Sequence, residues 1–263
     1  MDLLQAIVLG IVQGATEFLP VSSSGHLLLL QQAFGISEGN LFYSVMLHVG
    51  SLAAVIWLFR RDIISILSHP LKKPFIYLVI ATIPGALVGI LLKSKIEDLF
   101  GGGSLLGPAF LLTTIVLIIS EQFKPKEKKL KDTSYKTPII MGVFQAVAAV
   151  FPGLSRSGST IAGGLMCGLS RTSAARFSFM MSIPIILGAT LVDIKDVVSG
   201  GVDNIQPGSV LMCIAVSAVT SFFAINFMMK LIRNRKLYWF AAYTAVLGVL
   251  VMLDQYVLHV VFK

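Results

Sequence analysis

The stretch Gly10-Ile-Val-Gln-Gly-Ala-Thr-Glu-Phe-Leu-Pro-Val-Ser-Ser-Ser-Gly-His26 places a carboxylate, a proline, three serines and a histidine in an otherwise apolar region. A related stretch, Phe151-Pro-Gly-Leu-Ser-Arg-Ser-Gly-Ser-Thr160, follows with its proline 132 residues after that of the first, and it carries an arginine. Polar and ionisable side chains at membrane depth are costly, and they commonly mark functional sites. We therefore expect the two stretches to form one site.

The composition indicates an integral membrane protein. Of 263 residues, 56% are hydrophobic and 13% are charged, with a mean hydropathy of +0.85, whereas charged residues make up about 25% of a soluble domain. The net charge is +8, but Lys and Arg lie in short clusters between apolar segments, which argues against a nucleic-acid partner. The first residues lack the features of a removable signal peptide. Cys167 and Cys213, each among apolar residues, predict buried packing.

Six apolar segments have the length, about 17 to 25 residues, that a membrane-spanning helix needs. Two pairs of shorter apolar segments are each broken by a turn rich in Pro, Gly and Ser, which predicts re-entrant helix-loop-helix pairs buried in protein. The sequence thus predicts an all-α integral membrane protein with six full transmembrane helices and two re-entrant pairs. The predicted spans are 41–59, 75–92, 105–120, 174–192, 209–229 and 238–258, and the pairs are 3–19 with 26–35 and 139–151 with 159–169.

The distribution of Lys and Arg predicts the orientation of the chain. Loops 60–74, 121–138 and 230–237 carry four, six and four of these residues, against two in 93–104 and one in 193–208. By the positive-inside rule the first three loops are cytoplasmic. The single membrane domain, residues 1–263, is then an inverted-topology repeat of 1–120 and 139–258. Such repeats are common in transporters, so this architecture favours transport as much as catalysis.

Gln13 and Glu17 are four residues apart, so both lie on one face of the first short helix. Glu17 could ligate a divalent cation or act as a general base, or it could be a capped carboxylate at the membrane edge. His26 could move a proton, form a phosphorylated intermediate or simply fill the core. His48 has little polar company in its span, and we interpret it as a packing residue.

Hydroxyl groups gather where a helix begins after each broken turn. One serine can serve as the N-cap, while the free amides of a helix N-terminus favour a phosphate ligand and leave another serine as nucleophile. Arg156 needs an anion at membrane depth, which is either a phosphate or Glu17 in an ion pair between the two halves. We predict Ser23 as the nucleophile. The predicted substrate-binding residues are Ser22, Ser24, Ser155, Ser157 and Thr160.

The chain resembles the undecaprenyl-diphosphate phosphatases of the BacA/UppP type over essentially its whole length. The resemblance rests on Gln13-x-x-x-Glu17 with Pro20-Val-Ser-Ser-Ser-Gly-His26, and on Pro152-Gly-x-Ser-Arg-Ser-Gly-x-Thr160. It implies hydrolysis of undecaprenyl diphosphate, a C55 isoprenoid diphosphate, to undecaprenyl phosphate and inorganic phosphate. This reaction recycles the lipid carrier of cell-wall synthesis at the outer face of the bacterial cell membrane, and bacitracin resistance follows from it.

The resemblance also implies roles for individual residues. The family's acid pair falls on Gln13 and Glu17, its serine and histidine on Ser23 and His26, and its arginine on Arg156. Many relatives carry glutamate at the position of Gln13, so the implied cation site for Mg²⁺ or Ca²⁺ is weaker here. A transporter or flippase of a polyprenyl phosphate is the alternative. The lipid substrate and the bilayer are the expected partners, and a homodimer is compatible with the sequence.

Overall fold

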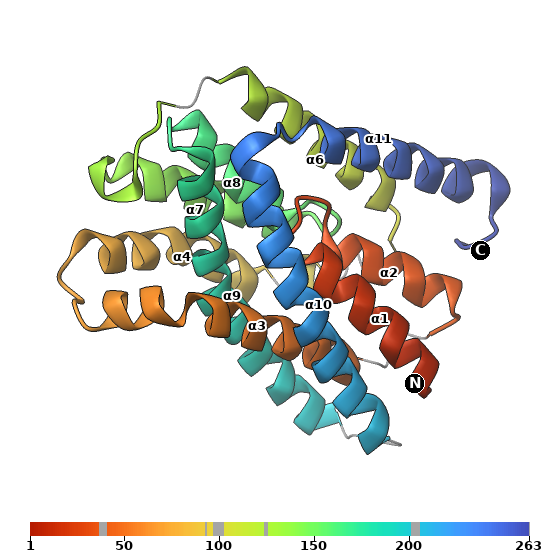
Figure 1. Ribbon diagram of the computed structural model, residues 1–263. Helices are drawn as coiled ribbons and strands as arrows, with labels where there is room; N and C mark the ends of the chain where they lie inside the picture. Colours follow the sequence, from red (N-terminus) through yellow and green to blue (C-terminus); the bar gives the residue numbers. More distant parts are fainter. Residues whose placement is uncertain (37–40, 93, 97–102, 124–125, 201–205, 263) are drawn as a thin grey trace.

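The computed structural model describes residues 1–36, 41–92, 94–96, 103–123, 126–200 and 206–262, which are helical apart from turns, short connections and an isolated bridge between Lys128 and Leu169 (Figure 1). This confirms the predicted all-α class. The α-helices are α1 Leu3–Thr16, α2 Ser23–Ala33, α3 Leu41–Leu67, α4 Lys73–Leu91, α6 Leu106–Gln122, α7 Lys136–Val150, α8 Arg156–Met166, α9 Arg171–Gly200, α10 Pro207–Asn234 and α11 Tyr238–Leu253. A 3₁₀ turn, Leu130–Asp132, and a π turn, Asp254–Leu258, complete the described elements.

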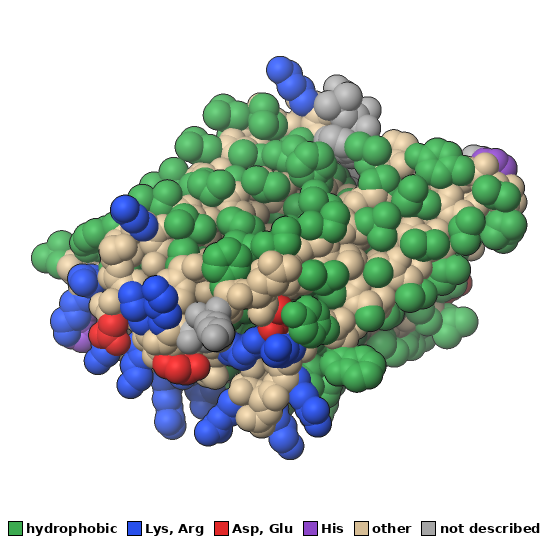
Figure 2. All heavy atoms as spheres, turned by 90° about the horizontal axis from the view of Figure 1, so that it is seen from above, with side chains coloured by type: hydrophobic (Ala, Val, Ile, Leu, Met, Phe, Trp, Pro, Cys, Tyr) green, Lys and Arg blue, Asp and Glu red, His purple; other side chains and the backbone are tan. Residues whose placement is uncertain are grey.

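Five helices in the described part of the chain are long and apolar enough to cross a membrane: α3, α4, α9, α10 and α11 with its π turn. The sixth predicted span, α6, has 17 residues, which is the lower limit for crossing the hydrocarbon core. Its length is bounded by the glycines before it and by the Lys-Pro sequence after it. Figure 2 shows apolar side chains over much of the surface, with Lys and Arg gathered at one end.

The two halves of the chain interleave, as Figure 1 shows. The first short helix of each half, α1 or α7, packs against the fourth helix of the other half, α10 or α4. Helix α3 packs against α9, and α6 packs against α11. A two-fold axis relating the halves would exchange these contacts; the division into two repeats, 1–120 and 139–258, stays a prediction. The opposite orientation of the two halves in the membrane stays a prediction.

Glycines allow α10 to approach the first half closely. A Cβ on Gly14 would lie 2.6 Å from the carbonyl oxygen of Ser217, and a Cβ on Gly50 would lie 2.4 Å from that of Ile214. Both distances are below van der Waals contact, so any larger residue would push α10 away from α1 and α3. This contact positions the end of α1, where Glu17 lies.

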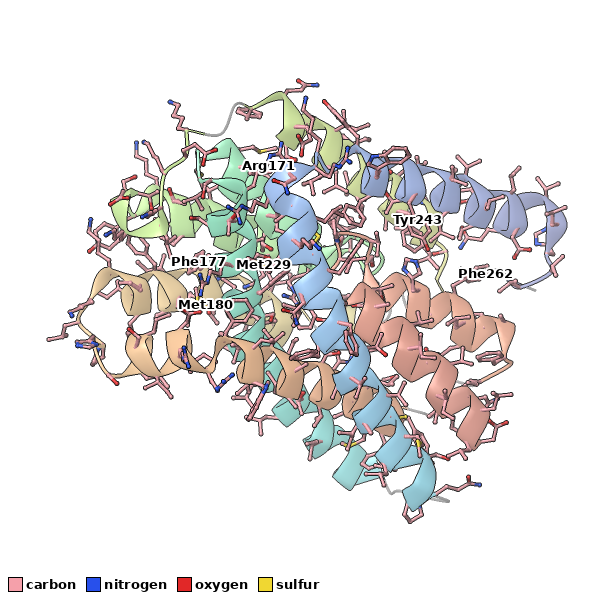
Figure 3. All side chains as sticks on the ribbon, viewed as in Figure 1. Arg171, Phe177, Met180, Met229, Tyr243 and Phe262 are labelled. Atoms are coloured by element: carbon pink, nitrogen blue, oxygen red, sulfur yellow. The ribbon has the colours of Figure 1, made fainter. Side chains whose placement is uncertain are left out.

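Buried apolar side chains and an ion pair hold the helices together around α9. Phe177 and Met180, labelled in Figure 3, belong to the main core cluster. At the start of α9, Arg171 forms an ion pair with Glu121 at the end of α6. Glu121 also accepts a hydrogen bond of 2.8 Å from the backbone nitrogen of Leu237. One carboxylate therefore ties together the ends of α6, α9 and α11.

Candidate active site

The two broken turns share a helix-capping arrangement. Ser22 is the N-cap of α2, and its hydroxyl accepts a hydrogen bond of 3.2 Å from the backbone nitrogen of Gly25. Ser155 is the N-cap of α8 and accepts one of 3.0 Å from Gly158. Each hydroxyl satisfies one of the free amides of a helix start. The caps of the two halves are thus equivalent in structure and use hydroxyls that the sequence assigned to substrate binding.

The turns from the two halves touch each other. The hydroxyl of Ser157 donates a hydrogen bond of 2.8 Å to the carbonyl of Leu19. The backbone nitrogen of Gly153 donates one of 3.4 Å to the hydroxyl of Ser24. These bonds join segments more than a hundred residues apart, so the N-termini of α2 and α8 are brought to a common place.

Glu17 lies at the centre of this contact and is 6% exposed. Its Oε1 accepts a hydrogen bond of 2.5 Å from Nη2 of Arg156, and its Oε2 accepts one of 2.5 Å from the hydroxyl of Ser23. The side-chain nitrogen of Gln13 donates a third bond, of 3.0 Å, to Oε2. The structure thus brings together Gln13, Glu17, Ser23 and Arg156. The ion pair of Arg156 with Glu17 is one of the two arrangements that we predicted for the arginine.

Hydroxyl groups on α3 and α10 support this centre from behind. Gln13 also contacts the hydroxyl of Ser51 at 3.5 Å, and Ser51 is bonded to Ser217 and Ser221 at 2.9 Å each. All three serines are buried. Buried polar groups joined in this way fix one arrangement of the surrounding helices, so the amide of Gln13 is held toward Glu17.

His48 is a neighbour of the site that the sequence interpretation missed. We interpreted it as a packing residue, whereas the structure places its side chain next to Glu17. Its Nε2 lies 3.9 Å from Oε2 of Glu17, and its Nδ1 lies 2.8 Å from the carbonyl oxygen of Ser44. The imidazole lines the same cavity as Arg156. The signal available was the spacing of Ser44, His48 and Ser51, which places three polar side chains on one face of α3.

Two adjoining cavities open at the turns. The smaller, of about 80 Å³, is mainly polar, and the larger, of about 350 Å³, continues from it between α3, α4, α7 and α9. Glu17, Ser23, Ser24 and Arg156 line both. The smaller cavity is also lined by Ser22, Ser155, Ser157, Ala148 and Leu154.

Three of the predicted site residues line neither cavity: Gln13, which reaches the site through its bond to Glu17, His26 and Thr160. Nδ1 of His26 is 2.6 Å from the carbonyl oxygen of Ser22, and its Nε2 is 2.7 Å from the hydroxyl of Tyr243, which Figure 3 shows on the side of α11 that faces α2. The hydroxyl of Thr160 is bonded to the carbonyl of Arg156 at 2.9 Å and to Ser178 at 2.6 Å. The side chains of His26 and Thr160 therefore support the turns from outside the cavities.

The hydrogen bond between His26 and the Ser22 carbonyl lies next to an unusual backbone conformation. Ser22 has a φ of 72°, in the left-handed region that residues other than glycine rarely adopt. This conformation persists only where surrounding contacts maintain it. The bond from His26 to the Ser22 carbonyl, with Tyr243 behind the ring, is such a contact. No sequence pattern could have connected Tyr243 with His26, which is 217 residues away.

The residues present do not by themselves form a site for a divalent cation. Gln13 presents its nitrogen to Glu17, and its buried Oε1 has no partner within the described structure. Both oxygens of Glu17 already accept hydrogen bonds, one of them from a guanidinium. Among the described residues no group of three or more His, Cys, Asp or Glu side chains converges. Mg²⁺ and Ca²⁺ need more oxygen ligands than this set supplies.

The fold and the site define a multi-pass membrane protein with a serine, a carboxylate and an arginine enclosed between two broken helices. The family described as bacitracin resistance protein BacA matches residues 6–250, and the chain belongs to this family. Undecaprenyl-diphosphatase of Methanobrevibacter smithii is 43% identical, covering 97% of this chain and 98% of that protein. Undecaprenyl-diphosphatase of Carboxydothermus hydrogenoformans is 40% identical with the same coverage. The predicted resemblance is confirmed.

Proposed function

We propose that this protein hydrolyses undecaprenyl diphosphate to undecaprenyl phosphate and inorganic phosphate. The reaction regenerates a lipid carrier for cell-wall synthesis and accounts for bacitracin resistance. The names of the relatives support this activity. The observation that carries it is the hydroxyl of Ser23, bonded to Glu17 at 2.5 Å in a cavity that Arg156 also lines. A nucleophile next to a base and a fixed cation is the arrangement that phosphoryl transfer requires.

Arg156 and the two helix N-termini would bind the terminal phosphate. Nη1 of Arg156 is buried and has no partner in the described structure, although Nη2 is paired with Glu17. A buried guanidinium nitrogen without an acceptor is costly, and a phosphate oxygen would satisfy it. The amides at the starts of α2 and α8 add partial positive charge on the same side. Binding would therefore replace part of the Arg156–Glu17 pair.

The first chemical step would transfer the terminal phosphoryl group to Ser23. As its oxygen attacks the phosphorus, the hydroxyl proton passes to Glu17, which already accepts it in a hydrogen bond. The bond between this phosphorus and the bridging oxygen breaks, and undecaprenyl phosphate leaves with the electron pair. Water then attacks the phosphorus, the bond from phosphorus to the Ser23 oxygen breaks, and this oxygen recovers the proton from Glu17. The proton that the water loses passes to the solvent. One water is consumed and two phosphate species result.

A requirement for Mg²⁺ or Ca²⁺ stays a prediction. Because the protein offers few oxygen ligands, we expect the cation to be held largely by the diphosphate itself, as Mg²⁺ commonly is. Gln13 and Glu17 would then lie beside it. A homodimer stays a prediction.

We expect the protein to lie in the cell's inner membrane with the cavity reached from the outer side. The loop charges support this orientation. Ser104 and Ser134 are both exposed and lie on loops of opposite predicted location. Single cysteines at these positions, in a chain without Cys167 and Cys213, should react with an impermeant maleimide from opposite sides of the membrane. Reaction of both from one side would exclude this topology.

Hydrolysis and transport are separated by an assay without compartments. The purified protein in detergent micelles should release inorganic phosphate from undecaprenyl diphosphate. A transporter or flippase needs two compartments and would release none in micelles. Release that persists unchanged when Glu17, Ser23 and Arg156 are all replaced by alanine would point to a contaminating phosphatase.

A further inference from the structure

A third cavity extends the active site toward the surface of the molecule. It has a volume of about 390 Å³ and lies between α4 and α9, beyond the larger of the two site cavities. Five residues line both this cavity and its neighbour, so the two are continuous. The shared residues are Gly85, Ala149, Ile185, Ala189 and Asp193.

The character of the lining changes along this path. Around Glu17 and Arg156 the walls carry hydroxyl and charged groups. Between α4 and α9 the lining is apolar except for Asp193. The end at Arg156 favours an anionic group, and the end between α4 and α9 favours an apolar one. A ligand that fits the whole path therefore has an anionic end and an apolar body. We refer to the outer, apolar part as the α4–α9 crevice.

Small residues keep the α4–α9 crevice open. Gly89 and Gly188 line it from opposite helices, and a Cβ at either position would meet no atom within 4 Å. Apolar side chains beside them, such as Leu87, Ile90 and Leu191, are exposed. In a membrane protein such side chains face lipid, so the crevice opens sideways toward the hydrocarbon of the bilayer.

A buried polar group marks the passage between the two parts. Gln145 is 1% exposed and lines the middle cavity. Its nitrogen donates a hydrogen bond of 3.2 Å to the carbonyl of Ala81, whereas its oxygen has no partner within the described structure. A buried acceptor without a donor is uncommon. A protonated phosphate oxygen, or a water bound to it, would supply that donor when a headgroup occupies the cavity.

We propose that the α4–α9 crevice binds the isoprenoid chain of the lipid diphosphate and admits it sideways from the bilayer. This inference rests on the proposed hydrolysis and adds the path of the chain. Two other apolar grooves are less suited. One lies between α3, α4 and α9 and the other between α10 and α11, and neither shares a lining residue with the 350 Å³ cavity. The first adjoins the α4–α9 crevice through Ala86 and Pro184, so a chain reaches it from the site only by way of the crevice.

The chain length of the substrate should therefore matter only while the crevice is open. Gly89→Phe and Gly188→Phe place a ring in the crevice without an initial Cβ clash, and both positions lie within helices. Gly208→Phe on α10 is the matched control, because this glycine also has open space and lines none of the cavities described above. Monodisperse elution and the thermal unfolding temperature of each variant report on folding.

The measurement is kcat/KM for isopentenyl, geranyl and farnesyl diphosphate. In the wild type and in Gly208→Phe we expect kcat/KM to rise with chain length. In the crevice variants kcat/KM for farnesyl diphosphate should fall by about tenfold or more, since filling an apolar pocket excludes the groups it would bind. Their value for isopentenyl diphosphate should stay within about twofold, because this short chain ends before the crevice. An unchanged dependence on chain length in both folded variants overturns the inference.

A second measurement does not depend on catalysis. A farnesyl phosphate with a diazirine at the end of its chain should crosslink to α4 and α9 at the crevice, and less so in Gly188→Phe. Crosslinks confined to the groove between α3 and α4 would place the chain elsewhere. If the wild type releases no phosphate from any diphosphate, the proposed hydrolysis fails, while the crosslinks still report whether the crevice binds the chain.

Discussion

The turn before α2 and the turn before α8 have the same local construction and different chemistry. Each begins a helix at a serine N-cap, and each needs a residue with positive φ, Ser22 at 72° and Gly153 at 98°. In the first turn the hydroxyl of Ser23 donates a hydrogen bond to a carboxylate, Glu17, in the wall of a cavity. In the second, Ser155 caps its helix, Ser157 bonds to Leu19, and the arginine carries the charge.

This difference shows how two turns with the same local construction can divide the roles within one site. The first turn contributes the group that reacts, and it holds a strained serine in place with His26 and Tyr243. The second turn uses a glycine where the backbone needs positive φ and contributes Arg156, whose charge is balanced by Glu17 of the first turn. Neither turn contains both a nucleophile with a base and a cation for the phosphate.

The largest effect is expected at Ser23. Ser23→Ala removes the hydroxyl that donates a hydrogen bond to Glu17. We expect kcat to fall by about a thousandfold or more, as for the loss of an essential nucleophile. Ser22→Ala and Ser24→Ala are matched controls on the same turn and should lose far less. Phosphate released from farnesyl diphosphate is the measurement. A Ser23→Ala enzyme within about tenfold of the wild type would leave water as the attacking group.

Arg156 tests the contribution of the second turn. Arg156→Ala should lower kcat/KM by about a hundredfold or more, because a fixed cation on a transferring phosphoryl group is lost. Arg156→Lys should recover only part of this loss, since lysine lacks the planar fork of the guanidinium. Arg176→Ala is the control, as Arg176 is paired with Asp62 away from the cavities. Equal rates in Arg156→Ala and Arg176→Ala would remove the second turn from catalysis.

Tyr243 tests whether support from α11 maintains the first turn. Tyr243→Phe removes the hydroxyl bonded to His26, which should cost about 1 kcal/mol of stability. We expect a roughly tenfold lower kcat with little change in KM, because His26 would hold the Ser22 carbonyl less firmly. Tyr238→Phe, at an exposed position on the same helix, should behave as the wild type. A change in KM alone would instead indicate that Tyr243 contacts the substrate.

Gln13 is expected to show the smallest effect. Gln13→Glu places a second carboxylate beside Glu17, and activity should stay within a few-fold while the dependence on Mg²⁺ becomes steeper, because carboxylates bind hard cations more strongly than amides do. Phosphate release across a titration with EDTA and Mg²⁺ is the measurement. Loss of activity at every Mg²⁺ concentration would show that the hydrogen bond from the Gln13 amide to Glu17 is itself required.

The helices and the pairing of Glu17 with Arg156 were predictable from the sequence. Apolar runs of sufficient length located the spans, and Pro20 and Pro152 located the breaks. An arginine and a carboxylate at membrane depth have few other partners, so their ion pair was one of two predicted states. The spacing of His48 from Ser44 and Ser51 could have shown a polar face on its helix, but not that this face meets Glu17. The contact of His26 with Tyr243 was not predictable, because it depends on which distant helix packs alongside.

The sequence by itself determined the membrane class, the approximate positions of the helices and the residue types of the site, because hydrophobicity, proline and charge act locally along the chain. The predicted boundaries were too narrow for α3 and α9, which end at Leu67 and Gly200 and not at residues 59 and 192. Only the tertiary structure decided which of these residues meet. It placed His48 beside Glu17, turned His26 toward Tyr243, buried Thr160 against Ser178, and opened a crevice between α4 and α9. These outcomes depend on how helices distant in sequence cross and how closely glycines let them approach, and no local pattern encodes that geometry.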